Sequence, residues 1–192
     1  MADPNRKDGF ERLSERDPGG PLACFAAPPA GQAVLRGRSA DGAFRRAAEA
    51  ALGFALPEDA LMAHAEGARA AFRLGPDYWL VVDEGDPAFG RRIAATPGLI
   101  AMDMSSARSR ARLRGAQAPD LLAAGAAIDL RSSALPTGAF AQTTVGNATA
   151  ILHVRAPETF DIYIARSFAR SWLVWLAHAG REFGLRIGDE SQ

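Results

Sequence analysis

A short motif occurs twice in the chain, and each copy opens a similar succession of predicted elements. Val34–Gly37, with the sequence VLRG, reappears as RLRG at Arg112–Gly115. A predicted helix follows each copy, and a series of predicted strands follows each helix. The distance between the copies exceeds the roughly 20–50 residues of solenoid repeats, so the pattern indicates two related halves. Chance similarity of a short motif is the alternative.

The first copy predicts a helix at 41–52, because its apolar residues recur at helical spacing and Gly53 can end it. Asp86 and Pro87 predict the start of a second helix, which the pair Pro97 and Gly98 ends. The predicted strands of this copy are 60–64, 68–74, 78–82 and 99–104.

The second copy repeats this order. A shorter helix is predicted at 119–124, and predicted strands follow at 139–144, 148–155 and 160–164. Ser167 is a favourable N-cap for the last helix, whose apolar stripe includes Phe168, Trp172 and Phe183 and which Gly184 ends. A short strand at 185–187 completes the copy.

These elements predict an α+β protein of two similar β-α-β-β-β-α-β halves, with mainly antiparallel sheets and helices on one face. We expect residues 1–20 to form a disordered segment, because they are charged and rich in Pro and Gly. The first half is predicted at 21–105 and the second at 106–192. The two halves should superpose and should join near residues 104–107.

Composition narrows the classes of function. Hydrophobic residues make up 48% of the 192 residues, which is enough for a core. The 22 basic and 22 acidic side chains balance, which argues against a nucleic-acid partner. No apolar run is long enough to span a membrane, and residues 1–20 lack the apolar segment of a signal peptide. We therefore expect a cytoplasmic protein that does not associate with membranes.

The sequence signatures of common active sites are missing. No dinucleotide-binding, phosphate-binding-loop or nucleophile-elbow motif occurs. His64, His153 and His178 lack the spacing of paired metal ligands, and the lone Cys24 has no partner for a disulfide or a CxxC motif. We predict no catalytic, cofactor-binding or metal-ligating residue in this chain, and we expect the isolated protein to be colourless.

Two regions are candidates for a subunit interface. In the first, four arginines alternate with smaller or apolar residues, so a strand would place them on one face. They are Arg108, Arg110, Arg112 and Arg114. That face is either solvated or a docking surface for an acidic partner or an anionic ligand. In the second, Arg166 and Arg170 accompany the aromatic residues of the last helix, which are either core residues or anchors for a partner.

We expect one of these two regions to be exposed in the isolated chain and covered in a complex. Replacing Arg110 and Arg112 with Glu should then leave folding nearly intact and weaken association. The uniformly apolar segment 78–82 is either a central strand or a strand that another chain covers.

Several segments carry a family resemblance. They are LGPDYWL at 74–80, the arginine-rich segment 104–115, the pairs LL at 121–122 and DL at 129–130, the pair QT at 142–143, and the run from 160 to 184. Within the last segment, RSFA at 166–169 is fairly specific in its strand-to-helix context. Together these segments, which lie between residues 60 and 187, resemble the gamma subunit of heterotetrameric sarcosine oxidases.

The resemblance implies a complex that oxidatively demethylates sarcosine to glycine and transfers the one-carbon unit to tetrahydrofolate. It implies alpha, beta and delta subunits as partners, with FAD, FMN, NAD and zinc in those subunits and a non-catalytic role for this chain. It also implies a fold like that of the folate-binding aminomethyltransferases. The alternatives are a gamma subunit of a related complex that acts on another N-methyl amino acid, and a stand-alone folate-binding aminomethyltransferase-like protein.

Overall fold

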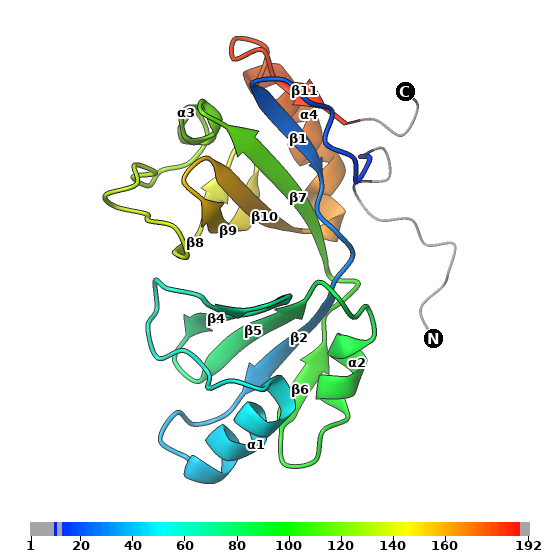
Figure 1. Ribbon diagram of the computed structural model, residues 1–192, viewed down its shortest axis with the longest axis vertical. Helices are drawn as coiled ribbons and strands as arrows, with labels where there is room; N and C mark the ends of the chain where they lie inside the picture. Colours follow the sequence, from blue (N-terminus) through cyan, green and yellow to red (C-terminus); the bar gives the residue numbers. More distant parts are fainter. Residues whose placement is uncertain (1–9, 11–12, 189–192) are drawn as a thin grey trace. The chain divides into compact units, whose positions relative to one another are not determined.

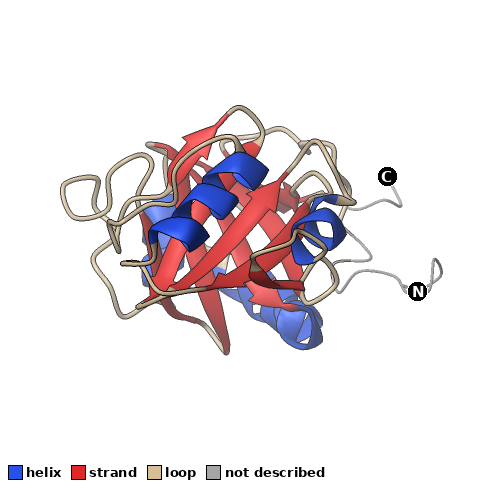
Figure 2. Cartoon of the chain, turned by 90° about the horizontal axis from the view of Figure 1, so that it is seen from below, coloured by secondary structure: helices blue, strands red, loops and turns tan. Residues whose placement is uncertain are grey.

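The computed structural model describes residue 10 and residues 13–188 (Figure 1). The chain divides into two compact units. The middle unit is Pro29–Ser105, and the terminal unit joins the described residues up to Pro28 with those from Ser106 onward. Strands predominate over helices in both units (Figure 2).

The middle unit is one antiparallel sheet with two helices on one of its faces. Its strand order is β3-β4-β5-β2-β6. Alternate residues of the sheet, such as Leu35 and Trp79, share one buried cluster with Phe44 of the first helix and Phe89 of the second. The elements are β2 (Gly31–Arg36), α1 (Gly42–Leu52), β3 (His64–Glu66), β4 (Arg69–Gly75), β5 (Tyr78–Asp83), α2 (Phe89–Ala94) and β6 (Ile100–Asp103).

Local chemistry sets both ends of α1, and the predicted terminator Gly53 is confirmed. The Asp41 carboxylate accepts hydrogen bonds from the backbone N–H groups of Ala43 and Phe44, which have no partner inside the helix. Gly53 follows the helix with φ 89°, a left-handed conformation that glycine adopts without steric cost. Between these ends, residues four apart, including Ala48 and Leu52, are buried in one stripe.

The terminal unit is a six-stranded sheet with the order β11-β1-β7-β10-β9-β8. All neighbouring strands are antiparallel except β1 and β11, which are parallel. No described helix has both the length and the apolar character that crossing a bilayer requires. The elements are β1 (Leu22–Ala26), β7 (Arg108–Gly115), α3 (Ala118–Ala123), β8 (Phe140–Val145), β9 (Ala148–Ala156), β10 (Thr159–Ala165), the 3-10 turn η1 (Arg166–Phe168), α4 (Ala169–Ala179) and β11 (Arg186–Ile187).

The predicted α+β architecture and its order of elements are confirmed. From β2 to β6 and from β7 to β11, the chain forms a strand, a helix, three strands, a helix and a strand. The repeated motif lies at the ends of β2 and β7. A Cβ on Gly37 would collide with the Phe44 ring, and one on Gly115 would collide with the backbone of Pro21. Both copies therefore need glycine at this position because another part of the chain approaches closely.

One strand breaks the correspondence between the units. β1 lies beside β7, in the position that β6 occupies beside β2, and β11 is displaced outward to pair with β1. The predicted first half, 21–105, therefore includes a strand that the structure places in the terminal unit. Pairing of β1 with β7 joins residues far apart in sequence, and the local pattern of β1, which is apolar throughout, does not specify that partner.

The predicted disordered segment 1–20 differs from the structure where its residues are described. Phe10 and Leu13 are buried, and the Phe10 ring packs edge-on against Trp172 with 5.9 Å between centroids. The backbone N–H of Ser14 donates to the Gly188 carbonyl over 3.0 Å. Two apolar side chains thus anchor a segment whose composition is otherwise polar. Residues 1–9 and 11–12 lie outside the described residues.

The boundaries of two predicted elements are also wrong. The strand predicted at 60–64 begins only at His64, because the Asp59 carboxylate accepts from the N–H groups of Leu61 and Met62 and holds a turn there. Ser167 lies inside η1 and does not cap α4, which runs from Ala169 to Ala179 and ends before the predicted Gly184.

Candidate functional site

A group of charged side chains gathers on one face of the terminal sheet. On β10, Asp161 lies directly opposite Arg112 of β7 and opposite His153 of β9. Opposed residues of neighbouring strands project to the same face. Arg110, two residues before Arg112, and Arg155, two residues after His153, lie on that face as well. We call these five residues the Asp161 cluster.

Asp161 holds three guanidinium groups. Arg112 donates to both carboxylate oxygens, with Nε–Oδ1 2.6 Å and Nη2–Oδ2 2.9 Å. Arg110 reaches Oδ2 at 3.3 Å and also donates to the Pro28 carbonyl at 3.0 Å, while Arg155 lies 3.7 Å from Oδ2. The side chains of Asp161 and Arg110 are 0% and 4% exposed. The cluster is therefore an internal ion-pair network that ties β7, β9 and β10 together.

The environment shifts the pKa values of two groups in the Asp161 cluster. Burial acts to raise the pKa of the Asp161 carboxyl, but the hydrogen bond from Arg112 and the charges of the three arginines hold that pKa below its ordinary value. Burial lowers the pKa of His153 to about 4; the charge of Asp161 opposes this shift, and the arginines add to it. At neutral pH the cluster therefore contains an ionised Asp161 and a neutral His153.

The four arginines of β7 are not uniformly exposed, and three of them are held by other parts of the terminal unit. Arg110 is buried, Arg112 is bound by Asp161, and Arg114 pairs with Asp17. Arg108 is half-buried opposite Ala165. Arg110 is therefore not the exposed residue that the first expectation for Arg110→Glu with Arg112→Glu assumed. We now expect this variant to impair folding, because it would place three carboxylates together in a largely buried sheet face.

The second candidate region presents a more open surface. α4 buries Ala169, Trp172 and Leu176. On its other side, Arg170 is exposed and lies four residues before Val174, which is 68% exposed. Phe168 is 50% exposed and Arg166 is half-buried at the entry to the helix. We call Arg166, Phe168, Arg170 and Val174 the α4 patch.

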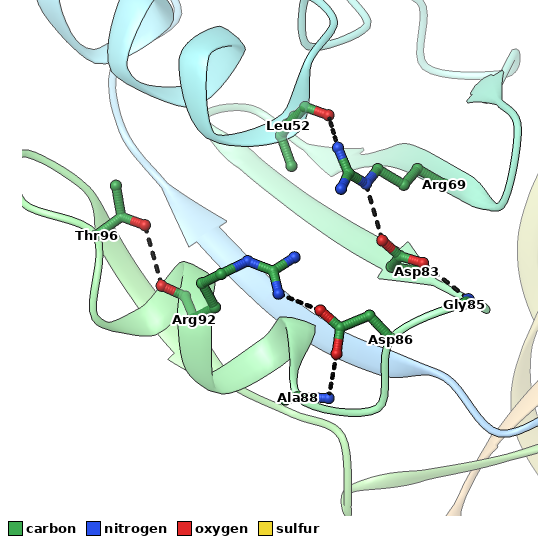
Figure 3. A network of polar contacts seen from close by, with 8 residues as sticks. All are labelled: Leu52, Arg69, Asp83, Gly85, Asp86, Ala88, Arg92 and Thr96. Atoms are coloured by element: carbon green, nitrogen blue, oxygen red, sulfur yellow. Dashed lines mark hydrogen bonds and ion pairs between the residues drawn. The ribbon is translucent and has the colours of Figure 1, made fainter.

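A separate set of polar contacts lies around the helices of the middle unit (Figure 3). Arg69 donates to Asp83 Oδ2 at 2.8 Å and to the carbonyl of Leu52, the last residue of α1, at 2.7 Å. Asp86 accepts from the Ala88 N–H and pairs with Arg92 of α2. Each carboxylate is thus used by an arginine and a backbone donor, which is typical of a structural network. Within the described residues, no three His, Cys, Asp or Glu side chains gather as metal ligands would.

Comparison with known proteins places these features in a family. The model of the sarcosine oxidase, gamma subunit family matches residues 36–182. Among solved structures, a chain of the heterotetrameric sarcosine oxidase from Corynebacterium sp. U-96, in complex with pyrrole 2-carboxylate, superposes with a TM-score of 0.82 at 22% identity, covering 93% of this chain and 96% of that one. No curated protein sequence matches the chain.

A second solved structure extends the likeness of the fold. Aminomethyltransferase T of the glycine cleavage system from Bartonella henselae superposes with a TM-score of 0.54 at 15% identity. The match covers 88% of this chain but 48% of that one, so the two units correspond to about half of the enzyme. At 22% and 15% identity, the two structural matches show a shared fold only. The family model, in contrast, matches most of the sequence and so shows the family. The chain belongs to the sarcosine oxidase gamma subunit family.

Proposed function

We propose that this chain is the non-catalytic gamma subunit of a heterotetrameric sarcosine oxidase. The complex would oxidise sarcosine to glycine, with oxygen as acceptor, and pass the one-carbon unit to tetrahydrofolate. The alpha, beta and delta subunits are the proposed partners, and a cytoplasmic location is part of the proposal. The family match over residues 36–182 carries this assignment.

The polar chemistry of the chain supports a structural role. In the proposed complex, the other subunits would bind FAD, FMN, NAD and zinc. In this chain, the guanidinium groups of Arg110 and Arg112 are held by Asp161 in a buried sheet face, an arrangement that suits folding better than phosphate binding. Cys24 is buried, and burial raises the pKa of its thiol to about 12, which makes it a poor nucleophile.

The family match and the shared fold are also compatible with two other functions. A related complex that oxidises another N-methyl amino acid would use a gamma subunit of the same family if, as we propose, the larger subunits bind the substrate. The fold shared with an aminomethyltransferase favours, less strongly, a stand-alone folate-binding protein.

The assignment is tested by affinity capture of the tagged chain from its native cells. We expect the captured complex to contain four different subunits, to absorb as a flavoprotein and to consume oxygen when sarcosine is added. The chain purified alone should show neither flavin absorbance nor oxygen consumption. A complex that prefers another N-methyl amino acid would favour the related oxidase, and flavin bound by the isolated chain would contradict the proposed division of labour.

We further propose that the α4 patch contacts a larger subunit. Arg166→Glu with Arg170→Glu should fold normally, because neither side chain is buried, and should reduce recovery of the co-expressed partners by about tenfold, because reversed charges meet a complementary surface. Arg46→Glu with Arg91→Glu is the matched control, since it reverses two exposed arginines of the middle unit. Equal recovery with both double variants would exclude the α4 patch as a docking surface.

A further inference from the structure

The strand β6 leaves one edge of the middle sheet open. Among the described residues it ends the order β3-β4-β5-β2-β6 and pairs with β2 alone. The Met104 N–H donates to the Gln32 carbonyl at 2.8 Å, and the hydrogen-bonding groups of successive residues alternate in direction along an antiparallel strand. The backbone N–H and C=O groups of Ile100 and Met102 therefore point toward β2. Those of Ala101 and Asp103 point toward the open edge.

The side chains of β6 add an apolar surface to this edge. Ile100 is 73% exposed and Met102 is 64% exposed. They lie two residues apart and so share the helix-free face of the sheet, because the intervening Ala101 packs on the cluster beneath the helices. Neighbouring large apolar side chains that remain exposed are typical of an interaction surface.

Two other described edge strands, β3 and β8, differ from β6 in the side chains that they expose. Edge strands in soluble proteins are usually short, charged or covered, which prevents unintended pairing. β3 has only three residues, all exposed, and includes Glu66. β8 carries Gln142, Thr143 and Thr144. β6 is also short and has one charged residue, Asp103, at its end. Unlike β3 and β8, it exposes two large apolar side chains, Ile100 and Met102.

The terminal unit shows how such an edge can be completed. There β1 occupies the position of β6, and β11 pairs with it in parallel through Ala23–Arg186 and Cys24–Ile187. In the part of the chain that the structure describes, no strand of the middle sheet occupies the position of β11. The same arrangement of strands thus has a sixth member in one unit and an open edge in the other.

We propose that an extended segment of a partner subunit adds to the middle sheet as a sixth strand, parallel to β6, with apolar side chains against Ile100 and Met102. This inference rests on the proposed function as a complex subunit. A second copy of this chain is a less suitable occupant, since two-fold symmetry would pair the two β6 strands antiparallel, whereas the pairing seen at β1 is parallel.

The test compares two equally exposed positions in the full complex. Met102 and Leu61 are 64% and 65% exposed in the same unit, so Met102→Lys and Leu61→Lys should both fold with unchanged thermal midpoints. We expect Met102→Lys to lower recovery of the co-expressed partner subunits by about tenfold, and Leu61→Lys to leave it unchanged. Hydrogen exchange of the wild-type complex supplies the second readout. The Ala101 and Asp103 amides should be protected in the complex and unprotected in the isolated chain.

The possible results distinguish a partner segment from a second copy of this chain, and the β6 proposal from the proposed function. Wild-type recovery with Met102→Lys would overturn the proposal, and so would amides of Ala101 and Asp103 that exchange equally fast with and without partners. Dimerisation of the isolated chain that Met102→Lys abolishes would assign the edge to a second copy. A wild-type complex that oxidises an amine other than sarcosine would overturn the proposed function while leaving the β6 measurements valid, and a chain that assembles with no other subunit would overturn both.

Discussion

Replacing Asp161 with Asn is expected to lower the free energy of unfolding of the terminal unit by about 3–5 kcal/mol. The substitution preserves the shape of the side chain but removes the negative charge that Arg110, Arg112 and Arg155 share. Because the Asp161 and Arg110 side chains are 0% and 4% exposed, water cannot take the place of the lost charge. The positive charges left behind in the sheet account for the size of the effect.

A matched substitution separates this effect from the loss of any ion pair. Asp129 also binds an arginine, with its oxygens 2.9 and 3.0 Å from Arg131 Nε, but the Arg131 side chain is 81% exposed. Asp129→Asn should therefore cost only a small fraction of the Asp161→Asn effect. Urea unfolding would be followed by tryptophan fluorescence in a Trp79→Phe background. The signal would then come from the terminal unit alone, through Trp172 and Trp175. Equal shifts of the midpoint for the two variants would contradict the internal role of Asp161.

Local signals account for most of the architecture that the sequence predicts. The N-cap Asp41, the left-handed Gly53 and the helical spacing between them depend on neighbouring residues only. The same holds for the alternation that places the arginines of β7 on one face. These signals suffice for the order of elements from β2 to β6 and from β7 to β11, but not for every boundary, as the start and end of α4 show.

Features that depend on pairing between distant segments could not be predicted in this way. The register that sets Asp161 between Arg112 and His153 joins three strands, and without it the β7 arginines look like a solvated face. One signal was available: Asp161 interrupts an otherwise apolar strand, and a buried carboxylate requires a positive partner. β1 likewise gives no local sign of its partner. The exposure of Ile100 and Met102 could not be predicted either, because an edge strand and a buried strand can share the same apolar pattern.

The terminal unit is also expected to lose about 3 kcal/mol of stability as the pH falls from 6.5 to about 4, through His153. Burial lowers the pKa of this imidazole from 6.5 to about 4 in the folded chain. Between these values the unfolded chain binds a proton that the folded chain does not, so acidification favours unfolding. Above pH 6.5 both states are neutral at this residue, and its contribution is constant.

Variants at two histidines isolate this pH dependence. His153 faces Asp161 of β10 and Phe140 of β8, with Arg155 on its own strand and Arg110 and Arg112 on β7. His153→Gln should flatten the dependence of unfolding free energy on pH between 6.5 and 4, whereas His178→Gln, at the exposed end of α4, should preserve it. Asp161 becomes protonated only under more acidic conditions, because its pKa lies below the ordinary value of 3.8. An unchanged slope in His153→Gln would mean that His153 is not buried in its neutral form.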